Sequence, residues 1–398
     1  MIAYNQEFIR NIKIVAKAKQ WYAYCLISSE QMATILKKYP VNFYKPNLFV
    51  KIGLFIFTCI IIGAALGLYS LVAFTANNGL ELSDVFPIIT CFLFAIICLV
   101  SLELFIRSKI TYNAGVDEAL LYSALGFVLS GILFIVDNDS SNGILFSFCF
   151  FLPFLIAASI RYMDSIIAIL TVLCVYNIFF LLLLNLGEIA KLLMPFAFML
   201  LSAFFYFFIK KQKQKEVFFL WNNCLIAAEC IVIIVFYLGC NYFVIRESSV
   251  TFFDMQIHPG GDIPLSFVFY CLTAVVPLLY VYFGLKNKDK ISLWIGLLLI
   301  AVAVLTFKYY FSLGHPEITL TITGMIMIVI AYVSIRYLKE DKYGITFKEA
   351  IDEDNFLKIN LEPLVIAQSF SPQVHAPQQP DNNFGDGDFG GAGSGSKF

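Results

Sequence analysis

Four polar side chains interrupt long apolar runs and have the chemistry to bind a proton, an ion or a small solute: Asn177, Asn222, Asn223 and Glu229. A carboxylate deep in an apolar run is costly unless it is protonated, paired or hydrated. We therefore expect Glu229 to face neighbouring helices and to be neutral. Two interpretations stay open. Either the four side chains line a polar cavity, or Glu229 makes only a structural hydrogen bond to another helix.

Three further acidic residues lie at the ends of apolar runs and are weaker candidates for a site: Glu103, Asp117 and Glu118. Asp117 and Glu118 open one run, where negative charge stabilises the N-terminus of a helix. Glu103 lies near the end of another run, from which its carboxylate reaches the membrane interface. Each of these positions also has a purely structural explanation.

The sequence contains no enzyme signature that we recognise. It has no HExxH, GxSxG or Walker motif, and no GxGxxG that opens a helix. The three histidines, His258, His315 and His375, lie in separate polar segments, which gives only weak support for a metal site. We predict a protein that is not an enzyme and that needs no cofactor or metal.

The composition places the chain among integral membrane proteins. Of its 398 residues, 60% are hydrophobic and only 14% are charged, against about 25% charged residues in soluble domains. Nine of the ten cysteines lie in apolar runs and none forms a CxxC pair, so we interpret them as small buried hydrophobes. The fold class predicted is all-α, a polytopic transmembrane helical bundle of about ten spans.

The apolar runs predict ten membrane-spanning helices between residues 49 and 338: 49–74, 85–106, 119–136, 144–160, 165–186, 192–209, 220–244, 265–285, 291–311 and 318–338. Residues 1–48 precede them as a basic cytoplasmic segment. It contains two short helices, the second capped by Ser28 with Gln31 at capping-box spacing. After the spans we expect a cytoplasmic segment, 339–367, with an amphipathic helix, and a disordered Pro- and Gly-rich tail, 368–398.

The lysines and arginines orient this layout. Four lysines lie between Lys210 and Lys215, in a segment that we interpret as a loop between two spans. With ten spans, all of the 27 Lys and Arg residues except Lys191, Arg246 and Lys308 fall on the same side as this loop. Positive charge is retained in the cytoplasm. We therefore predict that both termini are cytoplasmic.

The opening of the chain resembles a family of bacterial membrane proteins. The pattern consists of Ile27–Met32, Ile35 and Tyr39–Pro40, followed by a span that carries Gly53, Gly63 and Gly67. It is similar to the start of the family called domain of unknown function 2157. The resemblance implies a short cytoplasmic helical region, a glycine-bearing first span followed by many further spans, and a membrane location, without a known activity. We predict the bacterial inner membrane as that location. The last residues, 383–398, are similar to Gly-rich, aromatic-ended tails of unrelated bacterial membrane proteins.

Two functions fit these observations. The first is a membrane scaffold or sensor that binds a protein partner through its cytoplasmic ends. The second is a secondary transporter with a polar cavity near Glu229, a class in which broken helices surround the substrate. The prolines that could break spans are Pro87, Pro153, Pro195 and Pro277. Besides the lipid bilayer, we expect no nucleic acid partner, and the sequence does not fix the oligomeric state.

Overall fold

The structure is a computed structural model that describes residues 2–310 apart from 24, 42–45, 77–84, 110–111, 137–140 and 254–261. It also describes seven single residues between 321 and 336. The chain divides into two units, Met1–Glu353 and Asp354–Phe398. All the helices discussed below belong to the first unit.

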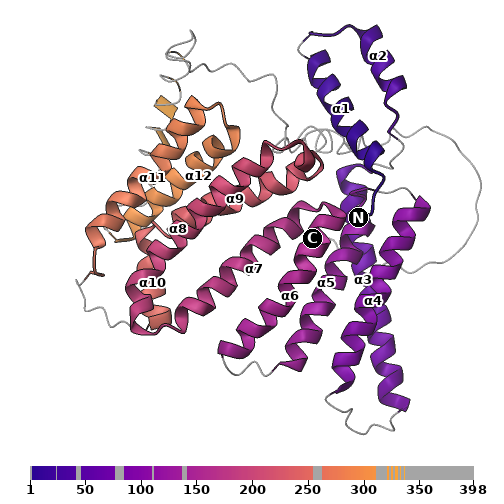
Figure 1. The fold of residues 1–398 in the computed structure, drawn as a ribbon, viewed down its shortest axis with the longest axis horizontal. Helices are drawn as coiled ribbons and strands as arrows, with labels where there is room; N and C mark the ends of the chain where they lie inside the picture. Colours follow the sequence, from indigo (N-terminus) through magenta and orange to yellow (C-terminus); the bar gives the residue numbers. More distant parts are fainter. Residues whose placement is uncertain are drawn as a thin grey trace, which may run out of the picture. The chain divides into compact units, whose positions relative to one another are not determined.

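The described residues form helices and no strands, which confirms the all-α class (Figure 1). In chain order these are α1 (Gln6–Ala23), α2 (Ser29–Lys38), α3 (Leu48–Ala76), α4 (Val85–Lys109), α5 (Val116–Ile135), α6 (Ser141–Tyr162), α7 (Ser165–Leu184), α8 (Glu188–Lys213), η1 (Glu216–Trp221), α9 (Asn222–Leu238), α10 (Tyr242–Phe253), α11 (Ser266–Lys286) and α12 (Lys290–Tyr310). Helix η1 is a 3-10 helix.

Nine of the helical segments in the described part of the chain are long and apolar enough to cross a membrane. They correspond to the first nine predicted spans. Each has 20 residues or more, and a 20-residue helix covers about 30 Å, the thickness of the hydrocarbon core. The tenth predicted span, 318–338, falls mostly outside the described residues. The segments 339–367 and 368–398, and the loops with His258, His315 and His375, also lie outside them.

The helices pack mainly as hairpins of chain neighbours. Helix α4 lies against α5, α6 against α7, α8 against α9 and α11 against α12 (Figure 1). Helix α7 also packs on α9, which connects the first half of the bundle to the second. Helix α3 is the least covered span, with 6% of its apolar window buried against 44% for α5. Most of the surface of α3 is therefore available to lipid.

The N-terminal helical hairpin, α1 and α2, forms as the sequence predicts. Helix α2 begins with the capping box, in which Ser28 Oγ accepts from the Gln31 amide and Gln31 Oε1 accepts from the Ser28 amide at 2.9 Å. This exchange satisfies two donors at the helix N-terminus. The Asn11 side chain donates to the Pro40 carbonyl at 3.0 Å and fastens α1 to the end of α2.

Two predicted boundaries are wrong. Three of the lysines of the expected loop, Lys210, Lys211 and Lys213, belong to the last turn of α8. There positive charge compensates the negative end of the helix dipole. The predicted span 220–244 is not one helix, because α9 ends at Leu238 and α10 begins at Tyr242. Helix α10 then occupies part of what we expected to be an outer loop.

The prolines do not cause this break. Pro153, Pro195 and Pro277 all lie inside continuous helices, α6, α8 and α11. Pro87 lies in the first turn of α4, where its missing amide hydrogen is not needed by the helix. The proline positions therefore do not support the paired broken helices expected of a transporter.

Candidate functional site

Glu229 is buried in α9 and has a cationic partner that the sequence did not reveal. Its side chain is 1% exposed, and Lys213 Nζ donates to its Oε2 at 2.7 Å. The lysine comes from the end of α8, across the turn formed by η1, and is 25% exposed. The structure therefore favours a charged pair over the neutral carboxyl that we predicted. The other oxygen, Oε1, has no hydrogen-bond partner among the described residues.

The three asparagines do not join Glu229 in one cavity. Asn222 and Asn223 open α9, the first half-buried and the second exposed. Asn177 is exposed on α7 and lines a cavity of about 330 Å³ whose walls come from α5, α6 and α7. Helix α9 contributes no residue to that cavity. The predicted four-residue polar site is therefore not assembled.

Apolar side chains fill the space between α7 and α9 instead. Tyr176, Ile209, Ala228 and Val232 form a buried cluster there. Tyr176 lies one residue before Asn177, and Ala228 lies one residue before Glu229, so the interface passes directly beside two of the predicted site residues. The contact between these two spans is therefore packed mainly with apolar side chains at this position.

Asp117 is a buried carboxylate with several hydrogen-bond donors. It is 1% exposed, and it accepts from the backbone amides of Asn113 and Ala114, each at 2.9 Å. It therefore organises the turn before α5 rather than only compensating the helix dipole. The phenol of Tyr4 donates to the same carboxylate at 3.3 Å.

Glu118 contributes to the same end of the bundle through an ion pair. Lys51 Nζ, from the first turn of α3, lies 2.7 Å from Glu118 Oε1. The two helices approach very closely here: a Cβ on Gly115 would lie 2.3 Å from the Lys51 carbonyl oxygen. Gly115 also has a φ of +96°, a conformation that other residues rarely adopt. Only glycine fits this crossing of α3 and α5.

Glu103 joins α4 to α6. Its Oε1 accepts from Arg161 Nε and from the Tyr162 hydroxyl, each at 2.8 Å, and Arg161 Nη2 lies 2.8 Å away. An arginine that presents two N–H groups to one carboxylate is among the strongest side-chain contacts in proteins. Glu103 is therefore held inside the bundle and is not simply extended to the interface.

The first residues of the chain contact the same end of the bundle. Ala3 donates its amide to the Arg161 carbonyl at 3.0 Å. Tyr4 is 7% exposed and its ring meets Tyr112 edge to face, with centroids 5.0 Å apart. Burial and the nearby Asp117 carboxylate raise the pKa of the Tyr4 phenol, so it remains a hydrogen-bond donor. We call Ala3 and Tyr4 the N-terminal latch.

A second contact attaches α1 to the other half of the bundle. Lys13 donates to the Phe219 carbonyl and lies over the Phe219 ring, 4.5 Å from its centroid. Phe219 belongs to η1, between α8 and α9. The N-terminal latch and α1 therefore contact α5, α6 and η1 together. No sequence pattern predicted these contacts, although an aromatic residue, Tyr4, lies just before α1.

The break between α9 and α10 contains a polar cluster that the sequence reasoning missed. Asn241 is 1% exposed. Its Oδ1 caps α10 by accepting from the backbone amides of Phe243 and Val244. Its Nδ2 donates to the hydroxyls of Tyr237 and Thr306.

Thr273 completes this arrangement by accepting from the Tyr242 amide at 3.0 Å. The polar groups of the break are thus satisfied within the protein, as a helix interruption at membrane depth requires. This explains how the break is stabilised.

The comparisons with known proteins give no identity for the chain. No protein-family model, no curated protein and no solved structure matches it. The resemblance of its opening residues to a family of unknown function therefore stays a prediction, and any functional conclusion must rest on the contacts described above.

Proposed function

We propose that the protein is a membrane scaffold or sensor whose cytoplasmic hairpin, α1 and α2, binds a protein partner. One observation carries the proposal. The hairpin is anchored at one end by the buried Tyr4, whereas Tyr22 and Leu26, at the turn between its helices, are 48% and 55% exposed. Helix α1 separates the two ends by about 25 Å, at 1.5 Å per residue. A fixed base with exposed apolar side chains at its tip is suited to docking.

The same contacts give the hairpin a connection to the spans. The N-terminal latch binds the end of α6 and the start of α5, and Lys13 binds η1. A relative movement of these helices would therefore change the position or the mobility of the hairpin. This coupling supports a sensor that reports a change in the membrane domain to a cytoplasmic partner.

Photo-crosslinking in cells tests the proposal. A crosslinking amino acid at Leu26 should give one discrete protein adduct, and the adduct should disappear when Tyr22→Glu is added. The same amino acid at the exposed Glu30 of α2 is the matched control for accessibility. Adducts with lipid alone, or an adduct at Leu26 that persists in the Tyr22 variant, would rule out a docking tip of this kind.

A transporter is the second candidate, and Glu229 Oε1 is the observation that favours it. A carboxylate oxygen that is buried and unpartnered among the described residues is a group that a proton or a cation would satisfy. The protein reconstituted in liposomes with an internal pH dye would then dissipate an imposed proton gradient, and Glu229→Gln would abolish the flux. Flux no faster than in empty liposomes would eliminate this candidate.

A further inference from the structure

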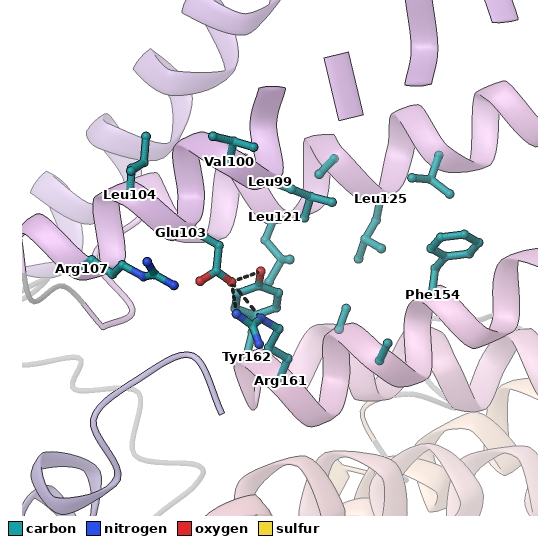
Figure 2. Close-up of a pocket in the computed structure, with 14 residues that line it drawn as sticks. Leu99, Val100, Glu103, Leu104, Arg107, Leu121, Leu125, Phe154, Arg161 and Tyr162 are labelled. Atoms are coloured by element: carbon teal, nitrogen blue, oxygen red, sulfur yellow. Dashed lines mark hydrogen bonds and ion pairs between the residues drawn. The ribbon is translucent and has the colours of Figure 1, made fainter. Parts of the chain in front are cut away.

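A groove of about 530 Å³ lies between α4, α5 and α6 (Figure 2). Its floor is formed by α5, where Leu121, Ala124 and Leu125 are buried. Its rims are apolar and open, because Leu104 on α4 is 61% exposed and Phe154 on α6 is 49% exposed. All three helices are candidate membrane spans, so the groove opens towards lipid rather than water.

One end of the groove is charged. Glu103, Arg107 and Arg161 gather there, as Figure 2 shows, while the other end is formed by apolar side chains. Glu103 balances the charge of Arg161 through their 2.8 Å contact. Arg107 lies one helical turn beyond Glu103 and is exposed. The end therefore holds two guanidinium groups against one carboxylate and carries a net positive charge.

We propose that this groove binds an anionic glycerophospholipid. The phosphate lies at Arg107 and the outer edge of Arg161, and an acyl chain lies along the floor of α5. Guanidinium groups suit phosphate because they offer paired N–H donors in one plane. The apolar part of the groove extends about 10 Å from Arg161 to Phe154 along α6, at 1.5 Å per residue. A soluble phosphate compound would leave that length uncovered, whereas a lipid fills both parts.

The position along the spans agrees with this occupant. Arg107 and Arg161 lie at the ends of α4 and α6 that we predict to be cytoplasmic, and anionic lipids are concentrated in that leaflet. The small side chains Ala124, Ala157 and Ala158 keep the groove open between the three helices. Larger residues at these positions would fill the space that the acyl chain needs.

Lipid binding to the purified, delipidated full-length protein tests the proposal. Native mass spectrometry would compare dioleoyl phosphatidylglycerol with dioleoyl phosphatidylcholine. We expect the anionic lipid to bind about 10-fold more tightly, the effect of one charge-assisted contact. Arg107→Gln should reduce this preference to about 2-fold or less. Arg10→Gln, an equally exposed arginine on α1, should leave it unchanged.

A second variant tests the acyl part separately. Ala157 is exposed, so Ala157→Phe fills the groove without disturbing the core, and it should weaken both lipids by about 10-fold. Ala65→Phe on the lipid-facing side of α3 is the control for added bulk. Equal binding of the two lipids to the wild type would overturn the proposal. An effect of Ala157→Phe on binding no larger than that of Ala65→Phe would also overturn it.

Discussion

Removing Lys213 should destabilise the protein more than removing the charge of Glu229. The reason is the unequal burial of the pair, because Glu229 is 1% exposed and Lys213 is 25% exposed. Lys213→Ala leaves the buried Glu229 carboxylate without its ion-pair partner, and breaking a buried pair in this way costs about 3–5 kcal/mol. Because Lys213 is 25% exposed, water screens part of the attraction within the pair, so we expect about 2–3 kcal/mol.

Glu229→Gln has a smaller effect for the complementary reason. It leaves a lysine that reaches water with part of its side chain, and the amide oxygen can still accept from the ammonium group. We expect a loss of about 1 kcal/mol, the value of an ordinary hydrogen bond. The double variant Lys213→Met, Glu229→Met removes both charges and should be more stable than Lys213→Ala alone.

Thermal unfolding of the detergent-solubilised variants, followed by intrinsic fluorescence, measures this order. The account requires Lys213→Ala to have the lowest melting temperature, with Glu229→Gln close to the wild type. Lys211→Ala, an exposed lysine on the same turn of α8, is the matched control. A Glu229→Gln variant as unstable as Lys213→Ala would show that the charge of Glu229 itself is needed, and the reasoning from burial would be refuted.

Three further predictions concern the fold and its orientation. Gly115→Ala places a methyl group 2.3 Å from the Lys51 carbonyl and should lower stability by more than about 2 kcal/mol, whereas Gly126→Ala meets no atom within 4 Å and should be tolerated in thermal unfolding assays. Cys25 is an exposed thiol on the hairpin and should react with a membrane-impermeant maleimide in inside-out vesicles but not in right-side-out vesicles; the reverse pattern would invert the topology. Protease should clip the tail, 368–398, in inside-out vesicles and leave the spans intact, because a Gly-rich run makes too few contacts to offset the conformational entropy that it would lose on folding. Resistance of the tail to protease without a partner would refute a disordered tail.

The sequence was sufficient to predict the elements that depend on local signals. The apolar runs located nine spans, and the Ser28–Gln31 spacing located the start of α2. It did not locate the end of α9, because hydropathy stays high through Gly239 and Cys240 and hides the interruption. Asn241, which caps α10, followed Gly239 closely enough to have indicated a break.

The partners of the site residues were harder to predict, because they come from segments far apart in the chain. Glu229 lies 16 residues from Lys213, and Tyr4 lies 113 residues from Asp117. Spacing within one helix gives no information on such pairs. The amphipathic pattern of α1 predicted a helix but not its contact with η1, because that contact depends on where α8 ends.

The docking of the hairpin on the membrane domain is the central claim, and hydrogen–deuterium exchange of the full-length protein in nanodiscs tests it most directly. Slow exchange is predicted for the amides of α1 in the wild type, and Tyr4→Ala should increase their exchange by about 10-fold or more, because it removes a buried aromatic ring that contributes about 1.5–3 kcal/mol. Tyr4→Phe, which loses only the 3.3 Å contact to Asp117, should have a much smaller effect. Rapid exchange of α1 in the wild type, or exchange that Tyr4→Ala leaves unchanged, would contradict the docked hairpin.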